Sequence, residues 1–353
     1  MKTEIVKIDN IQQAAKQGFF DKARDILQQG GLVVFPTETV YGLGADATDA
    51  AAAAKIYAAK GRPSDNPLIV HIATPADAVL YAETSPLYWR LAERFMPGPL
   101  TVIMPVKSSI PQTVTAGLST VALRCPSHPV ARALLQAAGR PIAAPSANLS
   151  GSPSPTCAAH VIDDMSGRVD MIIDGGDCDV GVESTIVKIE ADDTLTLLRP
   201  GGITLEMLEP IVGTVRIAEA VLGALPEGAI AVSPGMKYRH YAPKAPVYLL
   251  DGSSAQIVEY VKAQHGKIAV LCYEELLEEF KTFLPADRCF SFGKQTDVQH
   301  QAQQLFYLLR EMDKRDFDAI YAPLPPTSGL GMALYNRMIR AAAHHIIDLK
   351  KGN

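Results

Sequence analysis

The sequence lacks the features that mark secreted, disulfide-bonded or membrane-spanning chains. Its five cysteines among 353 residues are an odd number with no C-x-x-C pair, which excludes a disulfide framework or clustered zinc ligands and predicts reduced thiols. No uncharged apolar run reaches the length of a membrane span, and the opening MKTEIVKIDN alternates charged with apolar residues instead of forming a signal sequence. A cytoplasmic location, with no membrane partner, is therefore expected.

An excess of positive charge is also missing. The chain has 33 Lys and Arg against 38 Asp and Glu, a formal net charge of −5. Proteins held to nucleic acid by phosphate contacts usually carry a basic surface, so direct RNA binding is expected to be weak. Walker A, H-E-x-x-H and nucleophile-elbow motifs are absent too, so any chemistry is expected to lie in loops.

The length and the pattern of apolar runs predict two α/β domains. Residues 1–212 alternate short β-branched runs with helical segments, and neighbours such as STIVKI and TLTLL can form a hairpin, which predicts a mixed twisted sheet with flanking helices. Residues 246–353 predict a smaller, parallel, Rossmann-like domain of about four βα units, without the G-x-G-x-x-G of a dinucleotide site. Between them, residues 213–245 contain all but the last proline of the proline- and cation-rich stretch AVSPGMKYRHYAPKAP (231–246), which predicts an ordered linker strap.

Short apolar runs bounded by glycine or proline locate the strands. Those of the first domain are LVVF (32–35), LIVHI (68–72), LTVIMPV (100–106), TVALR (120–124), PIAAP (141–145), DMIID (170–174), STIVKI (184–189) and TLTLL (194–198). Those of the second are VYLLD, KIAVLCY, RCFSF and DAIYAPL. In TDAAAAAKIYAAKG, Thr48 or Asp49 can cap a helix that Gly61 ends.

Four basic residues lie at predicted element ends of the acidic first domain: Lys60, Arg62, Arg124 and Arg199. Cations at a helix C-terminus are favourable anyway, so Lys60 and Arg62 can be merely solvated. Arg124 ends an apolar strand and needs a carboxylate, from the protein or from a ligand. Together, positive charges focused in an acidic protein favour an anionic small molecule over a polymer.

Hydroxyl-rich loops follow two of the predicted strands. PTETVYG (36–42) can hold a small polar ligand, or its hydroxyls can bond within the turn. PSANLSGSPSPT (145–156) can present hydroxyl and N–H groups to phosphate oxygens, or be a plain loop. His71, on an apolar run, is by itself more often a core histidine than a substrate contact.

These stretches resemble a known family. PTETVYGLG, KGRPSDNPLIVH, PGPLT, TAGLSTVALRCP, PIAAPSANLSGSPSPT and GVESTIV occur in an order and at spacings similar to those of the YrdC-type threonylcarbamoyl-adenylate synthases. The family's K-x-R signature matches Lys60 to Arg62, and its S-x-N signature matches Ser146 to Asn148. SPGMKYRHYAP and the α/β module after it resemble the long, two-domain form, so the resemblance covers essentially the whole chain.

The resemblance implies a nucleotidyltransferase that forms L-threonylcarbamoyl-adenylate and pyrophosphate from L-threonine, bicarbonate or CO₂, and ATP, with Mg²⁺ carried by the ATP. The product would serve a transferase complex that modifies tRNA. The implied threonine contacts are Thr37, Thr39, His71, Arg124 and Ser184. The implied ATP contacts, with Lys60 and Arg62 in catalytic roles, are Lys60, Arg62, Asn66, Thr120, Ser146, Asn148, Ser154, Arg199 and His240. A lid over the nucleotide is expected from Tyr238, Arg239 and His240.

Two other interpretations stay open on the sequence alone. One is a non-catalytic RNA-binding module, against which the net charge argues. The other is adenylation of a carbamate from carbamoyl phosphate, as in the related hydrogenase-maturation carbamoyltransferases. That activity would be indifferent to threonine, and the absence of zinc-finger cysteine pairs weakens it.

Overall fold

The computed structural model describes residues 1–223 and 241–350. In these ranges the chain folds into two compact units. The first contains residues 1–150 and resumes at Ser154, and the second contains Gly151–Pro153 together with the chain that follows the undescribed segment. No helix in the described ranges is long and apolar enough to cross a membrane.

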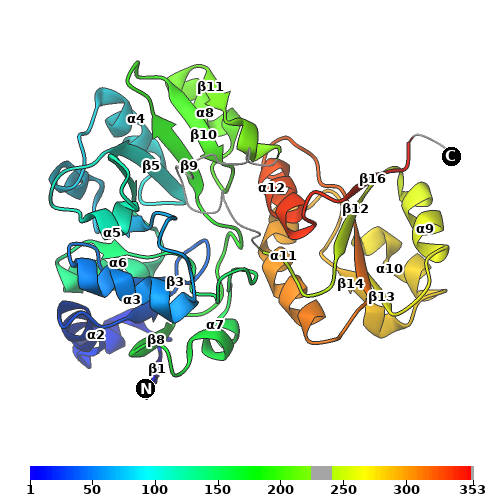
Figure 1. Cartoon of the computed structure of the whole chain (residues 1–353), viewed down its shortest axis with the longest axis horizontal. Coiled ribbons are helices and arrows are strands. Elements are labelled where there is room, and N and C mark those ends of the chain that lie inside the picture. Colours follow the sequence, from blue (N-terminus) through cyan, green and yellow to red (C-terminus); the bar gives the residue numbers. More distant parts are fainter. Residues whose placement is uncertain (224–240, 351–353) are drawn as a thin grey trace. The chain divides into compact units, whose positions relative to one another are not determined.

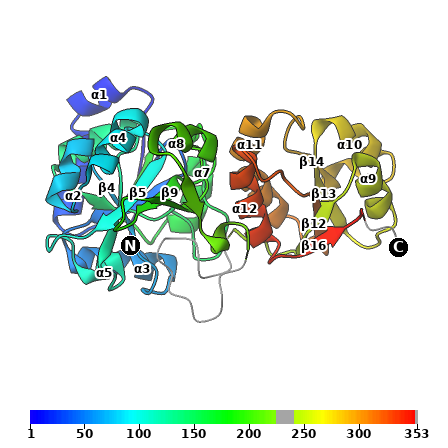
Figure 2. The same ribbon diagram turned by 90° about the horizontal axis from the view of Figure 1, so that it is seen from above.

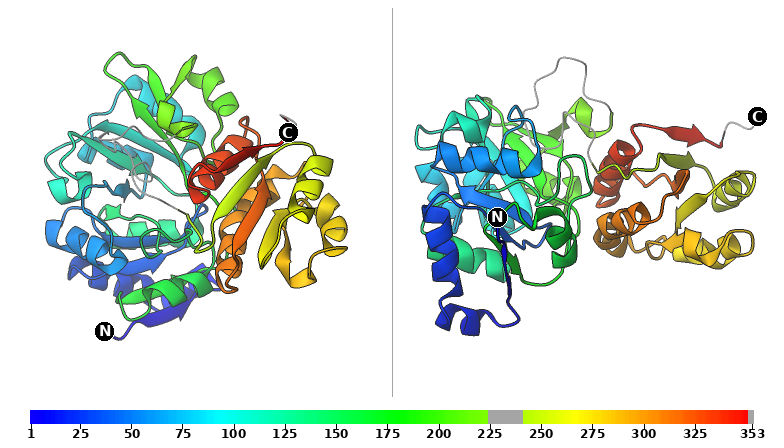
Figure 3. Two further views of the ribbon diagram at one scale, coloured as in Figure 1. Left: turned by 45° about the vertical axis from the view of Figure 1, so that its right-hand side comes forward. Right: turned by 60° about the horizontal axis from the view of Figure 1, so that its bottom comes forward.

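A mixed sheet of eleven strands runs through the first unit, in the order β1-β8-β2-β3-β7-β4-β6-β5-β9-β10-β11. Its strands are β1 (Glu4–Lys7), β2 (Val33–Phe35), β3 (Gly42–Asp46), β4 (Ile69–His71), β5 (Leu100–Pro105), β6 (Thr120–Arg124), β7 (Ile142–Ala143), β8 (Met171–Asp174), β9 (Thr185–Ile189), β10 (Leu195–Arg199) and β11 (Val215–Ile217). The N-terminal strand β1 pairs with β8 at one edge (Figures 1 and 3). Parallel pairs such as β4 with β6, and antiparallel pairs such as β9 with β10, confirm the mixed sheet and the hairpin.

Every strand predicted for this unit is present, but β1, β3 and β11 were not predicted. β3 reads GLGAD, which has little intrinsic strand propensity. A Cβ added at Gly44 would lie 2.8 Å from side-chain atoms of Phe35 and Ile142, so the glycine permits close packing between paired strands. β11 pairs with β10, so the first sheet extends into the 213–245 segment that was expected to be a linker.

Helices flank this sheet: α1 (Ile11–Lys16), α2 (Phe19–Gln28), α3 (Ala50–Lys60), α4 (Pro86–Phe95), α5 (Gln112–Thr115), α6 (Pro129–Ala138), α7 (Ala158–Met165) and α8 (Leu205–Val212), with 3₁₀ turns at Pro75–Leu80 and Glu219–Val221. α3 follows its predicted limits. Asp49, not Thr48, is its N-cap and accepts the N–H groups of Ala51 and Ala52. Gly61 ends it at φ 60°, in the left-handed region that favours glycine.

The core beneath α2 and α6 fixes β2 and the start of the loop that follows it. Phe20 and Leu27 of α2 and Leu134 of α6 pack in one buried cluster with Phe35 of β2. Each such side chain contributes about 1.5–3 kcal/mol when removed from water. β2 is thereby fixed up to its last residue, and the loop 36–41 starts from a rigid point.

The second unit is a parallel five-stranded sheet in the order β14-β13-β15-β12-β16. Its elements are β12 (Val247–Asp251), α9 (Ser254–Lys262), β13 (Ile268–Cys272), α10 (Glu274–Lys281), a 3₁₀ turn at Ala286–Arg288, β14 (Cys289–Ser291), α11 (Val298–Asp313), β15 (Ala319–Pro323), α12 (Gly331–Ala341) and β16 (Ile346–Asp348). Figure 2 shows α11 and α12 on one face of this sheet and α9 and α10 on the other. The predicted parallel α/β fold is confirmed, with β16 as an additional edge strand.

Candidate active site

The loop 36–41 connects β2 to β3, and its hydroxyl groups bond within it. Thr37 Oγ1 donates to the Val40 carbonyl at 2.6 Å and accepts the N–H groups of Thr39 and Val40 at 3.2 Å. Thr37 Oγ1 also lies 2.9 Å from the hydroxyl oxygen of Thr39, Oγ1. Both threonines are buried. The Thr37 hydroxyl is thus used by the turn, whereas Thr39 Oγ1 keeps acceptor capacity for a further partner.

The ends of β4 and β6 bring His71 and Arg124 side by side. The two residues are register partners in a parallel strand pair, and both are buried. The His71 ring packs edge-on against Phe35, with 6.0 Å between ring centroids. Burial, and secondly the positive charge of Arg124, lowers the pKa of His71 to about 3. The imidazole is therefore neutral near pH 7, and its Nδ1 has no hydrogen-bond partner among the described residues.

Arg124 is paired with a carboxylate that the sequence analysis did not single out. Its Nη2 lies 2.9 Å from Glu38 Oε1 and donates to Thr37 Oγ1 at 3.4 Å. The other Glu38 oxygen, Oε2, accepts the N–H of Ser127 at 3.1 Å. Arg124 thus has the protein carboxylate that its burial demands. One signal was available: Glu38 is the acidic residue of PTETVYG, and Arg124 needed a carboxylate.

Ser184 and Arg199 lie in contact, close to Arg124 in the sheet. Arg199, at the end of β10, donates from Nε to the Ser184 carbonyl at 3.0 Å and from Nη2 to Ser184 Oγ at 3.1 Å. Ser184 Oγ lies 2.8 Å from Thr101 Oγ1, and Thr101 is the register partner of Arg124. Thr101, which the sequence analysis missed as an ordinary strand residue, therefore lies on the strand between Arg124 and the Ser184–Arg199 pair.

Lys60 is bonded to the loop that carries the serine-asparagine signature. Its ammonium group, on a side chain that is 3% exposed, donates to the carbonyls of Ser146 and Asn148. The Ser146 hydroxyl donates to the Asn148 side-chain carbonyl. The backbone of Tyr41 bonds to Ala147 and to Pro155, so this loop and the 36–41 loop lie side by side. The structure thus brings the predicted lysine, serine and asparagine together.

Arg62 and Asn66 form a neighbouring group after α3. Arg62 Nη2 donates to the carbonyls of Asn66 at 3.2 Å and of Pro67 at 3.3 Å. The Asn66 side chain is fully buried, and neither its oxygen nor its nitrogen has a partner among the described residues. β4 starts at Ile69, so Arg62 and Asn66 lie on the connection that leads to His71.

Ser154 contacts a second buried carboxylate that the sequence analysis missed. Its Oγ donates to Glu183 Oε1 at 2.6 Å, and both side chains are buried. Glu183 directly precedes Ser184 in GVESTIV, so this contact connects the 145–156 loop to the start of β9.

One predicted ATP contact, Thr120, lies at the opposite end of β6 from Arg124. Thr120 begins β6 and Arg124 ends it, about 13 Å along an extended strand. Thr120 is only partly buried, and no side-chain bond to another predicted site residue is described for it. Tyr238, Arg239 and His240, the expected lid, lie outside the described residues.

Several orphaned polar atoms mark this region. Among the described residues, buried atoms without a hydrogen-bond partner include Glu38 Oε1, Arg124 Nε, His71 Nδ1 and both polar atoms of Asn66. Each such atom costs about 1–3 kcal/mol when it stays unpaired, so native structures rarely leave several together. Donors and acceptors are both present, which fits a ligand that carries both kinds of group.

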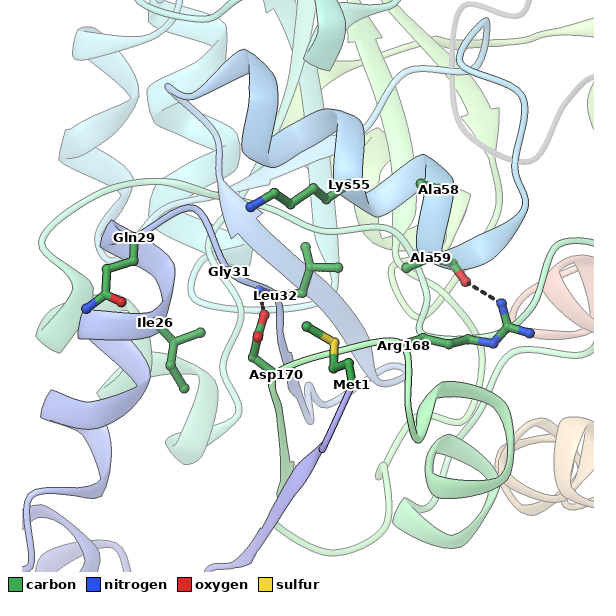
Figure 4. A pocket seen from close by; sticks show the side chains of 10 residues that line it. All are labelled: Met1, Ile26, Gln29, Gly31, Leu32, Lys55, Ala58, Ala59, Arg168 and Asp170. Atoms are coloured by element: carbon green, nitrogen blue, oxygen red, sulfur yellow. Dashed lines mark hydrogen bonds between the residues drawn. The ribbon is translucent and has the colours of Figure 1, made fainter.

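A separate cavity of about 540 Å³ contains none of the predicted site residues (Figure 4). Its polar side chains bond to the backbone: Lys55 Nζ to the Gly30 carbonyl, Arg168 Nη1 to the Ala59 carbonyl and Asp170 Oδ2 to the Leu32 N–H. Ala59 lies in the last turn of α3, and Gly30 directly follows the C-cap of α2, so these contacts satisfy carbonyls at and just beyond helix C-termini. Helix capping accounts for both cations of this cavity.

Comparison with known proteins decides the family. A family model described as telomere recombination matches residues 25–201, and one described as the threonylcarbamoyl-AMP synthase C-terminal domain matches residues 203–343. The threonylcarbamoyl-AMP synthase of Pyrococcus abyssi is 42% identical over 354 aligned positions, covering 97% of this chain and 99% of the relative. The chain belongs to the threonylcarbamoyl-AMP synthase family.

Two further relatives agree with this assignment to the threonylcarbamoyl-AMP synthases. The Bacillus subtilis threonylcarbamoyl-AMP synthase is 45% identical, over 92% of this chain and 93% of the relative. The crystal structure of P. abyssi Sua5 complexed with L-threonine superposes with a TM-score of 0.87 at 40% identity, covering 99% of each chain. The resemblance read from the sequence, including the two-domain form, is confirmed.

Proposed function

We propose that this chain is an L-threonylcarbamoyladenylate synthase, which converts L-threonine, bicarbonate or CO₂, and ATP into threonylcarbamoyl-AMP and pyrophosphate. The observation that carries the proposal is the group of orphaned buried polar atoms around the ends of β4 and β6, in a chain whose relatives are named threonylcarbamoyl-AMP synthases. A non-catalytic RNA-binding module would not need several buried polar atoms without hydrogen-bond partners in its interior.

The threonine side of the site is assigned to the loop 36–41 and the strand ends beside it. Arg124 would bind the carboxylate by its guanidinium fork, because its Nε is buried and has no partner among the described residues. His71, neutral at pH 7, would bond the side-chain hydroxyl through Nδ1, and Thr39 is the better placed of the two threonines to assist it. Ser184 completes this side through Thr101.

The ATP side is assigned to Lys60, Arg62, Asn66, Ser146, Asn148, Ser154 and Arg199. Lys60 supplies a point charge and Arg62 a planar fork, a combination suited to phosphates. A unit charge pair at ~4 Å contributes roughly 4 kcal/mol at an effective dielectric of about 20. Several cations can therefore offset much of the repulsion between the triphosphate and an approaching carbamate.

The reaction needs no nucleophile from the protein. The threonine amine captures CO₂ and loses a proton, giving a carbamate. A carbamate oxygen then forms a bond to the α-phosphorus of ATP, and the bond to the bridging oxygen breaks as pyrophosphate leaves. The protein contributes positioning and charge stabilisation, in agreement with the absence of familiar catalytic motifs from the sequence.

Mg²⁺ is proposed to arrive with ATP. The described residues contain no group of three or more His, Cys, Asp or Glu side chains arranged to hold a metal ion. Mg²⁺ keeps several waters and commonly binds through substrate phosphates, so the triphosphate would supply its ligands.

A cytoplasmic location is proposed from the five cysteines, all free thiols as predicted. The unstable product would pass to a transferase acting on tRNA.

Pyrophosphate release tests the proposed function. The purified chain is incubated with ATP and Mg²⁺, with and without L-threonine and bicarbonate. We expect pyrophosphate only when all substrates are present. Release that is indifferent to threonine would contradict the proposal. Release without threonine that instead depends on added carbamoyl phosphate would favour carbamoyl adenylation.

A further inference from the structure

We infer that Glu38 and Arg124 form a two-charge receptor, in which Arg124 binds the carboxylate of the amino-acid substrate and Glu38 binds its ammonium group. The inference rests on the proposed function and names how that site recognises an α-amino acid. It assigns a substrate contact to Glu38, in addition to its ion pair with Arg124.

In the Glu38–Arg124 pair, each side chain keeps a buried polar atom without a hydrogen-bond partner. Glu38 Oε1 lies 2.9 Å from Arg124 Nη2 but is not aligned with it for a hydrogen bond. Both described contacts of the guanidinium, to Glu38 and to Thr37, use Nη2, while Nε is buried without a partner in the described part of the chain. One anionic acceptor and one cationic donor therefore remain available within a single ion pair.

Contacts with Ser127 and Val180 hold Glu38 in place and leave its Oε1 atom unused. Its Oε2 accepts the Ser127 N–H at 3.1 Å, and its backbone carbonyl accepts the Val180 N–H at 2.8 Å. These two contacts come from segments outside the loop 36–41, and they hold the side chain and the backbone of Glu38 respectively. Oε1 is left as the acceptor that faces Arg124.

The charges of the pair match those of a zwitterion. The side chains of Glu38 and Arg124 are 7% and 4% exposed, so a ligand ion placed beside them loses most of its hydration. A lone carboxylate ligand would meet one cation and one anion, and its own charge would stay uncompensated. An α-amino acid brings both signs, and each can meet its opposite. His71 is neutral and adds no third charge.

The test compares two ligands that differ only in the amine. L-Threonine and (R)-3-hydroxybutyrate share the carboxylate and the hydroxyl, and their dissociation constants are measured by calorimetry on the whole chain and on Glu38→Gln. The wild-type chain should prefer threonine by at least about tenfold, the effect of one charge-assisted hydrogen bond. In Glu38→Gln this ratio should fall to near one, because the amide carries no charge.

The ratio separates ligand contact from a purely structural role. If Glu38 only orients Arg124, the substitution weakens both ligands equally, because both carry the carboxylate, and the unchanged ratio overturns the inference. Asp46→Asn is the matched control. Asp46 is another buried carboxylate of the same sheet, bonded to Arg140 at 2.8 Å and to the Thr48 N–H, and its loss should leave the ratio unaltered.

A second variant, Glu38→Asp, tests the inference if Glu38→Gln fails to fold. Glu38→Asp keeps the charge but withdraws the carboxylate by one carbon, so the preference for threonine should fall part of the way; an unaltered preference overturns the inference. Failure of the proposed function is separately visible, since the wild-type chain would then release no pyrophosphate in response to threonine. A wild-type chain that releases it but binds both ligands equally contradicts only the two-charge receptor.

Discussion

Lys60 and Lys55 are two lysines of helix α3 with different environments. Lys60 is buried and donates to two carbonyls of the 146–148 loop, whereas Lys55 is exposed and donates to the Gly30 carbonyl. We expect Lys60→Ala to lower kcat/KM for ATP by about 100-fold or more, as loss of a preorganised transition-state donor does. Steady-state pyrophosphate release measures it.

Lys55→Ala is the control for this prediction, since it removes the same side chain from the same helix. Its activity should stay within about twofold of wild type. Lys60→Ala also leaves two carbonyls without their donor, at a cost of about 1–3 kcal/mol in the free energy of unfolding, so both variants are checked by urea denaturation. A folded Lys60→Ala chain with wild-type ATP kinetics would refute the assigned role.

The neutral state of His71 predicts a pH dependence of stability. Its pKa is lowered to about 3, while an unfolded histidine titrates near 6.5, so between these values the unfolded chain binds a proton that the folded chain does not. The His71 contribution to stability is therefore complete above pH 6.5 and declines as the pH falls. At pH 5 the loss should approach ~2 kcal/mol.

Urea denaturation at pH 7.5 and at pH 5 measures this effect. His71→Asn has no titrating group, so its free energy of unfolding should fall less between the two pH values than that of the wild-type chain. An equal fall in both chains would mean that His71 is protonated in the folded state.

At the scale of elements, Gly61 and Gly139 form a matched pair. Each ends a helix, α3 or α6, at φ 60°, and a Cβ added to either has nothing within 4 Å. Ala at either position should therefore cost about 1 kcal/mol through backbone strain alone. Only Gly61 lies between Lys60 and Arg62, so only Gly61→Ala should also raise the KM for ATP. Equal ATP kinetics in the two variants would contradict the importance of this helix end.

Elements were predictable where local sequence and tertiary contacts agree. TVALR forms β6 with the predicted limits, because β-branched and apolar residues suit a buried strand. GLGAD was not recognised as β3, because its glycines serve close packing against β2, which is near in sequence, and against β7, which is distant. The basic residues were predictable from their places at element ends, and the need of Arg124 for a carboxylate was one signal for Glu38. The partners Glu183 and Thr101 were not predictable, since only folding shows which side chains meet.

For the whole molecule, the net charge of −5 predicts weak binding of the free chain to tRNA. We expect fluorescence anisotropy with labelled tRNA at 150 mM salt to give no dissociation constant below about 1 µM. Tight binding that falls steeply between 50 and 200 mM salt would indicate several phosphate contacts, and would revive the interpretation as an RNA-binding module.

We expect the orphaned buried polar groups of the first unit to converge on one site for an amino acid and a nucleotide. A crystal structure of the chain with L-threonine and a non-hydrolysable ATP analogue tests it most directly. We predict that threonine lies within hydrogen-bond distance of Arg124 Nε and His71 Nδ1, with the nucleotide at Lys60 and Asn66. Ligands bound elsewhere, with these atoms still unpaired, would contradict the account.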